Sequence, residues 1–372
     1  MGNVTHFVLM LLAFMGLCVW LVLEKRLNRR ARAGFLAVIH VNGIRGKTST
    51  CRMLDAVLRE KFRVFTKTTG SDPRVLHVDG RDLPLRRLGP PNIGEQIRML
   101  RMARREGAEI VILECMAVRP DLQCICEEQI LRSDISIITN VRYDHVLEMG
   151  STLDEIAAAL SGTIPSNGTL YTGDAAYYPY FAEKCEAKGS TCVLCPQDKP
   201  GEENHSIVQA VSASLGLEDT QIGAGLQAVR PDAGMRSLFS LQNKQGRPVD
   251  FLNLFAANDP QSAWQRAAAY MDEYPSVFFA YNSRSDRPDR TLLFAEHFFP
   301  QIPNAKVFLL GNGTPLARRL LGKAVPTLTL QNVKDFDSCL DIPTGSLLIG
   351  LGNIKGEPFR FLNALGQEAE KI

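Results

Sequence analysis

Residues 35–48 read FLAVIHVNGIRGKT, and this stretch decides the fold. Residues 35–41 are short, apolar and β-branched, a glycine-containing turn follows, and a helix-like segment runs from about residue 47 to residue 62. A strand, a glycine loop and a helix in this order can hold phosphate, because glycines let backbone N–H groups approach the anion at the start of the helix. The stretch therefore predicts a nucleotide-binding α/β unit.

The glycine loop is a shortened variant of the P-loop. Two residues separate Gly43 from Gly46, whereas the usual pattern has four. Lys47 would offer a cation to the terminal phosphates of ATP, and Thr48 would offer a hydroxyl to Mg²⁺. The residues predicted to bind ATP here are Asn42, Gly43, Ile44, Arg45, Gly46, Lys47, Thr48 and Ser49.

Outside the P-loop, short apolar runs alternate with helix-like stretches. Runs at residues 109–113 and 135–139 fit a parallel sheet covered on both faces, and residues 66–96, rich in glycine, proline and charge, predict loops or a small hairpin. A second series begins near residue 249, with apolar runs at 277–281, 306–310 and 346–351. The fold class is α/β, with a P-loop parallel-sheet central domain over residues 33–235 and a smaller Rossmann-like C-terminal α/β domain over 236–372.

The N-terminus predicts a membrane anchor over residues 1–32. Residues 7–23 contain no charge, at the lower limit of length for a transmembrane helix, and Lys25, Arg26, Arg29, Arg30 and Arg32 follow. By the positive-inside rule, the single span places the body on the cytoplasmic side of the cell membrane. Because these cations follow the apolar run rather than precede it, an uncleaved anchor is favoured over a secretory peptide. The alternative is a buried N-terminal helix of a soluble domain.

Composition narrows the class further. The chain has 372 residues, 45% of them hydrophobic and 22% charged, which indicates folded globular material. A net charge of +2 is too small for general nucleic-acid binding. Nine cysteines at irregular spacing favour a reduced cytosolic body.

Polar residues follow two neighbouring strands of the predicted sheet. Glu114 ends the apolar run 110–113, and Asn140, Asp144 and His145 follow the run 135–139. Ligands of open α/β sheets bind at the carboxyl ends of strands, so a carboxylate there suits Mg²⁺. Considered alone, Glu114 could be a solvated or salt-bridged glutamate at the end of a strand, and His145 could have a structural role.

Together these residues resemble the Mur ligase family, which includes peptidoglycan amino-acid ligases and folylpolyglutamate synthetases. Its pattern N-x-x-x-D-H-x-x-x-M-G is matched by Asn140, Asp144, His145, Met149 and Gly150, and its shortened P-loop by residues 43–48. The resemblance implies magnesium ligands at Thr48, Glu114 and His145. Lys47, Glu114 and His145 are accordingly the predicted catalytic residues.

Further segments extend this resemblance downstream. Asn204 resembles the asparagine that the family uses toward adenine, residues 231–236 its linker motif with Arg236, and Asp259 the aspartate that contacts ribose. Residues 282–290 resemble the loop that carries charged groups back to the active site. The predicted substrate ligands are Asn140, Arg284, Asp286, Arg287 and Arg290.

Within the Mur ligase family the chain most resembles the ligases of poly-γ-glutamate synthesis. The likeness rests on the N-terminal anchor and on six segments, at residues 41–47, 67–70, 89–96, 114–118, 256–259 and 282–291. It implies that glutamate and the poly-γ-glutamate chain are the substrates. It also implies PgsC/CapC-like and PgsA/CapA-like membrane subunits as partners.

One departure from the family concerns a lysine that many Mur ligases carry, carboxylated, shortly after the histidine motif. Residues 152–163 contain no lysine. Either the magnesium environment is completed otherwise, by Glu148 or Asp154, or only one metal ion is tightly held.

The sequence thus predicts an ADP-forming, ATP- and Mg²⁺-dependent acid–amino-acid ligase. It would phosphorylate the chain-end carboxylate of poly-γ-glutamate and join glutamate through the acyl phosphate. The alternatives are a membrane-anchored P-loop NTPase that acts as a switch or motor, a scaffold without activity, and a related ligase for another amino acid.

Overall fold

A computed structural model describes residues 2–69, 73–87, 89–196, 204–229, 238–257 and 259–369, and the side chains of all these except 2–5 and 366–369. The chain forms two compact units. The first contains Met1–Val141 and Glu148–Val229, and the second contains Arg142–Leu147 and Arg230–Ile372. The expected boundary near residues 231–237 lies outside the described residues.

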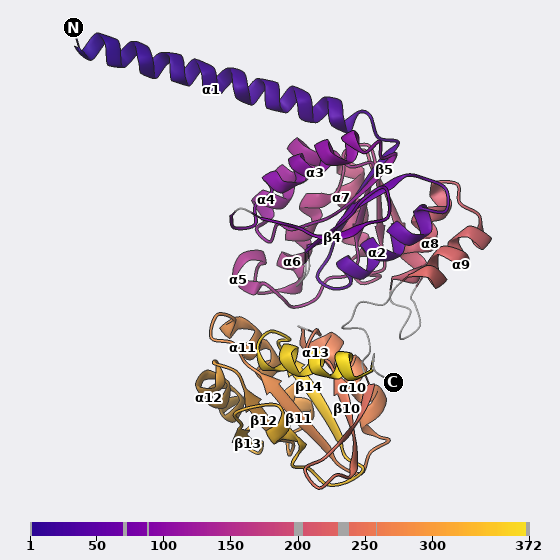
Figure 1. The fold of residues 1–372 in the computed structure, drawn as a ribbon, viewed down its shortest axis with the longest axis vertical. Coiled ribbons are helices and arrows are strands. Elements are labelled where there is room, and N and C mark those ends of the chain that lie inside the picture. Colours follow the sequence, from indigo (N-terminus) through magenta and orange to yellow (C-terminus); the bar gives the residue numbers. More distant parts are fainter. Residues whose placement is uncertain are drawn as a thin grey trace. The chain divides into compact units, whose positions relative to one another are not determined.

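The first unit is built on one eight-stranded sheet (Figure 1). Its strands are β1 (Ala37–Asn42), β2 (Val64–Lys67), β3 (Arg74–Leu76), β4 (Asp82–Pro84), β5 (Ile110–Glu114), β6 (Ile135–Ile138), β7 (Thr169–Thr172) and β8 (Thr191–Leu194). They lie in the order β4-β3-β2-β5-β1-β6-β7-β8, and the six from β2 to β8 in this order are parallel. The predicted parallel α/β sheet is confirmed.

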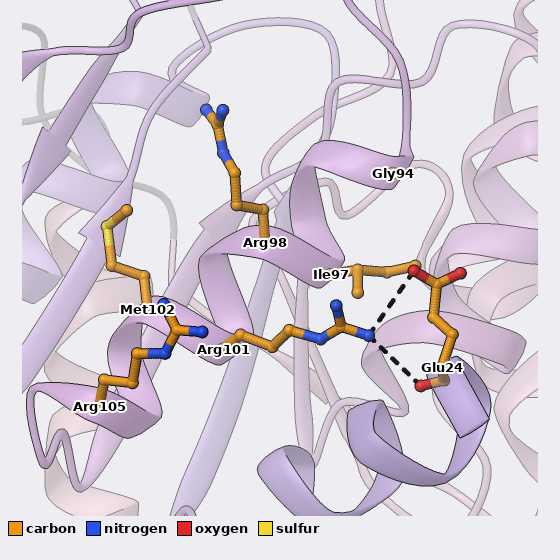
Figure 2. Close-up of a pocket in the computed structure, with 7 residues that line it drawn as sticks. All are labelled: Glu24, Gly94, Ile97, Arg98, Arg101, Met102 and Arg105. Atoms are coloured by element: carbon orange, nitrogen blue, oxygen red, sulfur yellow. Dashed lines mark hydrogen bonds and ion pairs between the residues drawn. The ribbon is translucent and has the colours of Figure 1, made fainter. Parts of the chain in front are cut away.

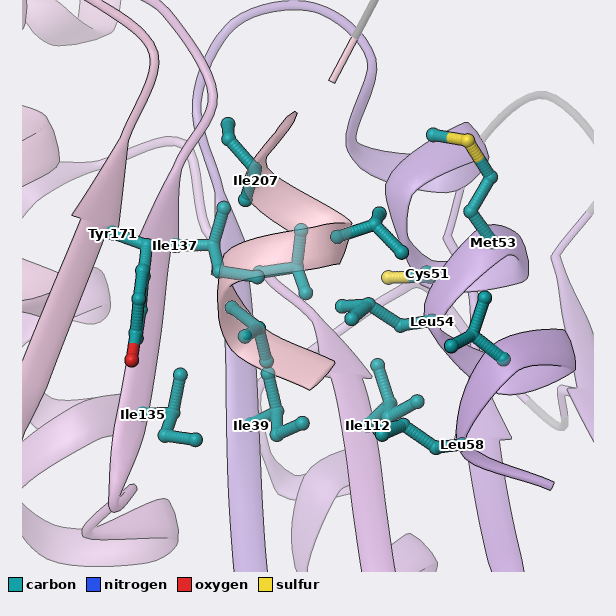
Figure 3. Close-up of a cluster of buried hydrophobic side chains, with 14 of the residues drawn as sticks. Ile39, Cys51, Met53, Leu54, Leu58, Ile112, Ile135, Ile137, Tyr171 and Ile207 are labelled. Atoms are coloured by element: carbon teal, nitrogen blue, oxygen red, sulfur yellow. The ribbon is translucent and has the colours of Figure 1, made fainter. Parts of the chain in front are cut away.

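Helices connect these strands and cover both faces of the sheet. They are α2 (Lys47–Leu58), α3 (Gly94–Arg105), α4 (Pro120–Ile125), the π-helical η1 (Cys126–Leu131), α5 (Val146–Met149), α6 (Leu153–Leu160), the 3₁₀ turn η2 (Ser161–Thr163), α7 (Tyr178–Ala187), α8 (His205–Ser214) and α9 (Asp219–Ala228). Alternate residues of β1 face opposite sides, as the period of a strand requires. Ile39 packs toward α2 and α8, among side chains such as Leu54 and Ile207 (Figure 3), whereas Val38 belongs to the cluster beneath α3.

Strand order creates a switch point at the centre of this sheet. From β1 the chain crosses to β2 on one side, and it later returns to β6 on the other side of β1. Connections that leave neighbouring parallel strands in opposite directions open a crevice at their carboxyl ends. The ends of β1, β5 and β6, with the loops that follow them, therefore border the expected ligand site.

Between β2 and α3 the chain adds a hairpin to the edge of the sheet. β3 pairs antiparallel with both β2 and β4. The prediction of a small hairpin within residues 66–96 is thereby confirmed for the described part of that segment.

The N-terminal helix α1 (Gly2–Arg32) extends away from the rest of the first unit (Figure 1). Residues 6–32 are long and apolar enough to cross a membrane, with a mean hydropathy of 2.5 in a window of which none is buried. Its C-terminal end is fixed to the sheet unit. Asn28 donates a hydrogen bond to the Ile130 carbonyl at 2.9 Å, and Arg32 forms an ion pair with Asp134 at 2.7 Å.

The second unit contains a six-stranded sheet in the order β13-β12-β11-β14-β10-β9, parallel except for β9. Its strands are β9 (Leu238–Gln242), β10 (Pro248–Asn253), β11 (Val277–Asn282), β12 (Lys306–Leu310), β13 (Thr329–Asn332) and β14 (Leu347–Gly352). Its helices are α10 (Pro260–Met271), α11 (Pro288–His297), η3 (Phe299–Gln301), α12 (Thr314–Ala324), η4 (Asp337–Leu340) and α13 (Glu357–Ala369). Both faces of this sheet carry buried apolar clusters, so the expected second α/β unit is confirmed.

A buried ion pair supports the strand that leads into the P-loop. Nδ1 of His40, in β1, lies 2.8 Å from Oε2 of Glu127, whose other oxygen accepts hydrogen bonds from the backbone N–H and hydroxyl of Ser133. Burial by itself lowers the pKa of His40, but Cys115 and the Glu127 carboxylate outweigh it and raise the pKa to about 9. This pKa favours the protonated imidazole at neutral pH, although its buried Nε2 has no hydrogen-bond partner among the described residues.

This pair predicts a loss of stability in alkali. Because the folded-state pKa of His40 lies above its unfolded value, its contribution is complete below about pH 6.5 and disappears as the pH rises through about 9. A shift of this size corresponds to up to about 3 kcal/mol in the free energy of unfolding. Thermal unfolding of the detergent-solubilised protein from pH 6 to pH 10 should show the loss in wild type and a flatter profile in His40→Asn. Parallel profiles would contradict it.

Candidate functional site

The P-loop connects β1 to α2 with two glycines in left-handed conformations. Gly43 has φ 115° and Gly46 has φ 81°. A Cβ atom on Gly43 would lie 2.1 Å from Oγ1 of Thr139, and one on Gly46 would lie 2.3 Å from Nδ2 of Asn204. Both positions require glycine, because a side chain would meet conformational strain and a close contact at once. Asn204, predicted to serve adenine, thus lies directly beside the P-loop.

Residues that follow β6 hold the backbone of the P-loop. The Arg45 N–H donates to Oδ1 of Asn140 at 3.0 Å, and Nδ2 of Asn140 donates to the Arg45 carbonyl at 3.1 Å. The Thr139 hydroxyl donates to the same carbonyl at 2.5 Å, and the Ile44 N–H donates to the Asn140 carbonyl at 3.2 Å. Asn140 is therefore a positioning residue for the P-loop, whereas its predicted contact with substrate stays a prediction.

The first turn of α2 brings Thr48 to the end of β5. The Thr48 hydroxyl donates to Oε2 of Glu114 at 3.0 Å, and the Thr69 N–H donates to the same oxygen at 2.7 Å. Lys47 directs Nζ onto the loop, 2.6 Å from the Gly43 carbonyl. A hydroxyl and a carboxylate are the hard oxygen ligands that Mg²⁺ and similar cations prefer, so this pair fits the predicted metal.

A buried lysine beside Glu114 was not assigned from sequence. Lys67 ends β2 with its side chain fully buried, and Nζ lies 3.6 Å from Oε2 of Glu95. Glu95 also pairs with Arg87 at 2.6 Å. Burial lowers the pKa of Lys67, and the Glu95 and Glu114 carboxylates oppose that shift. The sequence could have indicated this residue, because a lysine at the end of an apolar strand is buried and its charge then requires a partner.

The histidine motif lies in the second unit, within Arg142–Leu147. Its contacts there are to α11 and its N-terminal flank. Arg287 lies 3.4 Å from Nδ1 of His145, Arg290 lies 3.9 Å from Oδ2 of Asp144, and the ring of Tyr143 stacks on His297. His145 has φ 52°, an unfavourable conformation for a residue with a side chain, and such strain persists only where surrounding contacts enforce it.

Other predicted site residues have internal contacts of their own. Asn42 turns its amide toward Gln123 and Thr163, at 2.8 and 3.2 Å. Asp259 caps α10 by accepting from the Ser262 N–H at 2.8 Å.

The charged loop before α11 is paired as well. Arg284 pairs with Asp286 and holds its pKa below the ordinary value, while the buried Arg290 also donates to Asn353. Ser49 lies in the first turn of α2. Arg236 and the linker motif lie outside the described residues.

Within the described part of the chain, no three His, Cys, Asp or Glu side chains gather as a metal site. Of the predicted trio, the first unit contains Thr48 and Glu114, and the second contains His145. Asp154, one of two residues considered for completing the site, accepts a hydrogen bond from the Tyr177 hydroxyl at 2.9 Å. A cation held by Thr48 and Glu114 would need further oxygen ligands from nucleotide or water.

Two family models match the chain and together cover most of it. The Mur ligase middle domain matches residues 41–217, and the poly-gamma-glutamate synthase CapB C-terminal domain matches residues 238–368. A solved bifunctional folylpolyglutamate synthase/dihydrofolate synthase from Yersinia pestis, complexed with AMPPNP and a Mn ion, superimposes with a TM-score of 0.62. That likeness has 16% identity and covers 92% of each chain, and it shows the fold.

The fold and the matching family models are those of the Mur ligase class. The chain is 32% identical to the PGA synthase CapB of Bacillus subtilis over 90% of its own length and 91% of that protein. It is 30% identical to the capsule biosynthesis protein CapB of Bacillus anthracis, over 95% and 81% of the two chains. The chain belongs to the poly-gamma-glutamate synthase CapB family, and the predicted resemblance is confirmed.

Proposed function

We propose that this protein is the ATP-dependent ligase that lengthens poly-γ-glutamate, by phosphorylating the chain-end carboxylate and joining glutamate to it. The observation that carries the proposal is the contact between Thr48 and Glu114 at the P-loop of a chain of the CapB family. A P-loop alone would serve any NTPase. Membership of the CapB family favours a ligase over other P-loop enzymes.

The reaction needs activation because a carboxylate does not form an amide spontaneously in water. One carboxylate oxygen attacks the γ-phosphorus of ATP, the bond to the β-phosphate oxygen breaks, and ADP leaves. The amino group of glutamate then attacks the acyl carbon, the bond from that carbon to the phosphorylated oxygen breaks, and inorganic phosphate leaves while the nitrogen loses a proton. Each step is mainly a matter of positioning and of neutralising charge.

The P-loop supplies most of that positioning. Gly43 and Gly46 allow the loop its positive φ angles and its close packing against Thr139 and Asn204, and the hydrogen bonds from Thr139 and Asn140 fix the loop before ATP arrives. Lys47 would exchange its carbonyl partners for the β- and γ-phosphates, which places its charge on the transferred group. Asn204, against Gly46, would contact the nucleotide.

Thr48 and Glu114 would hold Mg²⁺, and His145 would complete its ligands. When bound, the cation neutralises charge on the phosphoryl oxygens. The Glu114 carboxylate is already held in place for the cation, because it accepts hydrogen bonds from the Thr69 N–H and the Thr48 hydroxyl. A Mn ion and AMPPNP are bound in the related Yersinia pestis synthase.

On the second unit, guanidinium groups would receive substrate carboxylates. Arg287 lies beside His145, and Arg284 and Asp286 form an exposed pair in the same loop. A guanidinium matches a carboxylate in bidentate fashion, so Arg287 is our leading candidate for the chain-end carboxylate or for glutamate. Arg290 is buried with Asp144 and Asn353, and a positioning role for the histidine motif suits it better.

Helix α1 would anchor the ligase to the cell membrane with its catalytic units in the cytoplasm. Its apolar stretch is long enough to cross, and the cations that follow it favour retention on the cytoplasmic side. An anchored ligase could pass its growing product to membrane subunits. PgsC/CapC-like and PgsA/CapA-like proteins are the proposed partners.

The test measures phosphate release from ATP and Mg²⁺ by the detergent-solubilised protein, with and without those partners. L-glutamate, D-glutamate and other amino acids are offered with a γ-glutamyl acceptor, and Lys47→Ala serves as the blank. Glutamate-dependent formation of ADP, together with a hydroxamate trapped by hydroxylamine, would support the acyl-phosphate ligase. ATP turnover that ignores every amino acid would instead indicate an NTPase switch or motor.

A further inference from the structure

A pocket of about 440 Å³ lies between the C-terminal end of α1 and the outer face of α3 (Figure 2). Three arginines line it, Arg98, Arg101 and Arg105, together with Glu24 from α1. Its other side chains include Ile97 and Met102. The pocket therefore combines cationic groups with an apolar wall, and its size suits one small ligand group.

Helical spacing puts the three arginines on one face of α3. Residues three and four positions apart lie above one another on a helix, so 98, 101 and 105 form a single row. The opposite face, with Met99, Leu100 and Ala103, is buried against the sheet. Arg98 and Arg105 are exposed, so the row is open to a ligand.

The pocket carries an excess of positive charge. Glu24 opposes it, with a carboxylate oxygen 3.6 Å from Arg101, whose guanidinium also lies 3.5 Å from the Glu24 carbonyl. Among the residues that the structure describes, Arg98 donates only to the Arg86 carbonyl, at 3.3 Å, and Arg105 forms no hydrogen bond or ion pair. Glu95, the acidic residue of α3, faces Arg87 and Lys67 instead. Three guanidinium groups and one carboxylate leave a site for an anion.

The position of this pocket along α1 indicates which anion. Glu24 directly follows Leu23, the last residue of the apolar stretch, and Lys25, Arg26 and Arg29 come next. If α1 crosses the membrane as proposed above, the pocket lies at the level of the lipid headgroups. We propose that it binds the phosphate of an anionic phospholipid of the cytoplasmic leaflet, and thereby holds α3 and its sheet at the membrane surface.

A lipid fits these observations better than the polyanionic product does. Guanidinium groups bind phosphate oxygens in bidentate fashion, while Ile97 and Met102 can contact the glycerol and upper acyl carbons. A polycarboxylate chain would need a basic groove that continues beyond one pocket. Leu27 and Leu36 are also exposed, near the end of α1 and just after it, and add apolar surface to this part of the chain.

The test titrates the full-length, detergent-solubilised protein with dioleoylphosphatidylglycerol and counts bound lipid by native mass spectrometry. The variant Arg98→Gln/Arg101→Gln/Arg105→Gln should bind this lipid roughly 100-fold more weakly, because it removes the charge-assisted hydrogen bonds to one phosphate, each of which contributes roughly tenfold or more. Glu24→Gln should bind it roughly two- to fivefold more tightly, since it removes the opposing charge. Dioleoylphosphatidylcholine should show neither difference.

The matched control removes three charges from the basic flank of α1, in Arg26→Gln/Arg29→Gln/Arg30→Gln. If the pocket binds the lipid, this control should lose much less affinity for it. Equal losses of affinity in the two triple variants would show only a general attraction between basic residues and anionic lipid, and would overturn the proposal. So would binding of a poly-γ-glutamate oligomer that depends on the α3 arginines while the lipid does not. Alkaline extraction of membranes tests separately whether α1 is inserted, and glutamate-dependent ATP turnover tests the ligase activity. A failure of the lipid-binding proposal can therefore be distinguished from a failure of the membrane anchor or of the proposed function.

Discussion

Replacing Glu114 with glutamine is expected to reduce glutamate-dependent ATP turnover by roughly 100- to 1000-fold. The glutamine amide oxygen can take the place of Oε2 and accept the hydrogen bonds from Thr48 and Thr69, so the loop should keep its shape. The negative charge that would hold the cation is lost, and such a charge accounts for several kcal/mol of transition-state stabilisation. Turnover measured against Mg²⁺ concentration should show a raised half-saturation point as well as a lower maximum.

Glu60→Gln provides the matched control for this prediction. It makes the same chemical change at an exposed position just beyond the end of α2, away from the P-loop. Its turnover and its Mg²⁺ dependence should equal those of wild type. If Glu114→Gln also kept wild-type Mg²⁺ dependence, Glu114 would not be a metal ligand, and Glu148 and Asp154 would become the carboxylates to change next.

The fold could be predicted in outline because its central strands, such as β1, β5 and β14, are buried on both faces. Such strands appear in sequence as short, continuous apolar runs, which locate them without any partner being known. The run 306–310 coincides with β12, and the run 277–281 differs from β11 by one residue. The order of the strands in the sheet could not be predicted from the sequence, because it depends on how many strands each connection crosses. The switch point beside β1 therefore emerged only from the structure.

The candidate site was predicted by residue type, but the direction of each side chain was not. Asn140 and Glu114 both follow apolar runs, yet one holds the P-loop backbone and the other receives Thr48. The two residues differ because Glu114 ends β5 and Asn140 follows β6, and these strands lie on opposite sides of β1. The resemblance predicts that Asp259 contacts ribose, which stays a prediction, and the structure shows that Asp259 also caps α10. An aspartate followed by proline is a usual start of a helix, so the sequence contained that signal.

Gly43→Ala is expected to lower kcat/KM for ATP by about 100-fold, although it adds only a methyl group. The new Cβ would lie 2.1 Å from Oγ1 and 2.7 Å from the backbone nitrogen of Thr139, and it would have to adopt φ 115°. Either the loop or Thr139 must move, and Thr139 helps to fix the Arg45 carbonyl. A displacement of about 1 Å in a positioned phosphate site can cost this much in rate. Steady-state kinetics with varied ATP measures the effect.

Gly80→Ala separates the steric contact from the conformational strain. Gly80 lies in the turn between β3 and β4 with φ 87°, close to a left-handed value, but a Cβ there meets no atom within 4 Å. Both variants should lose about 1–3 kcal/mol of stability from the positive φ, observed as a lower unfolding midpoint. Only Gly43→Ala should lose ATP turnover well below its own unfolding temperature. If both variants lost turnover in proportion to their stability, the P-loop contact with Thr139 would have no role beyond folding.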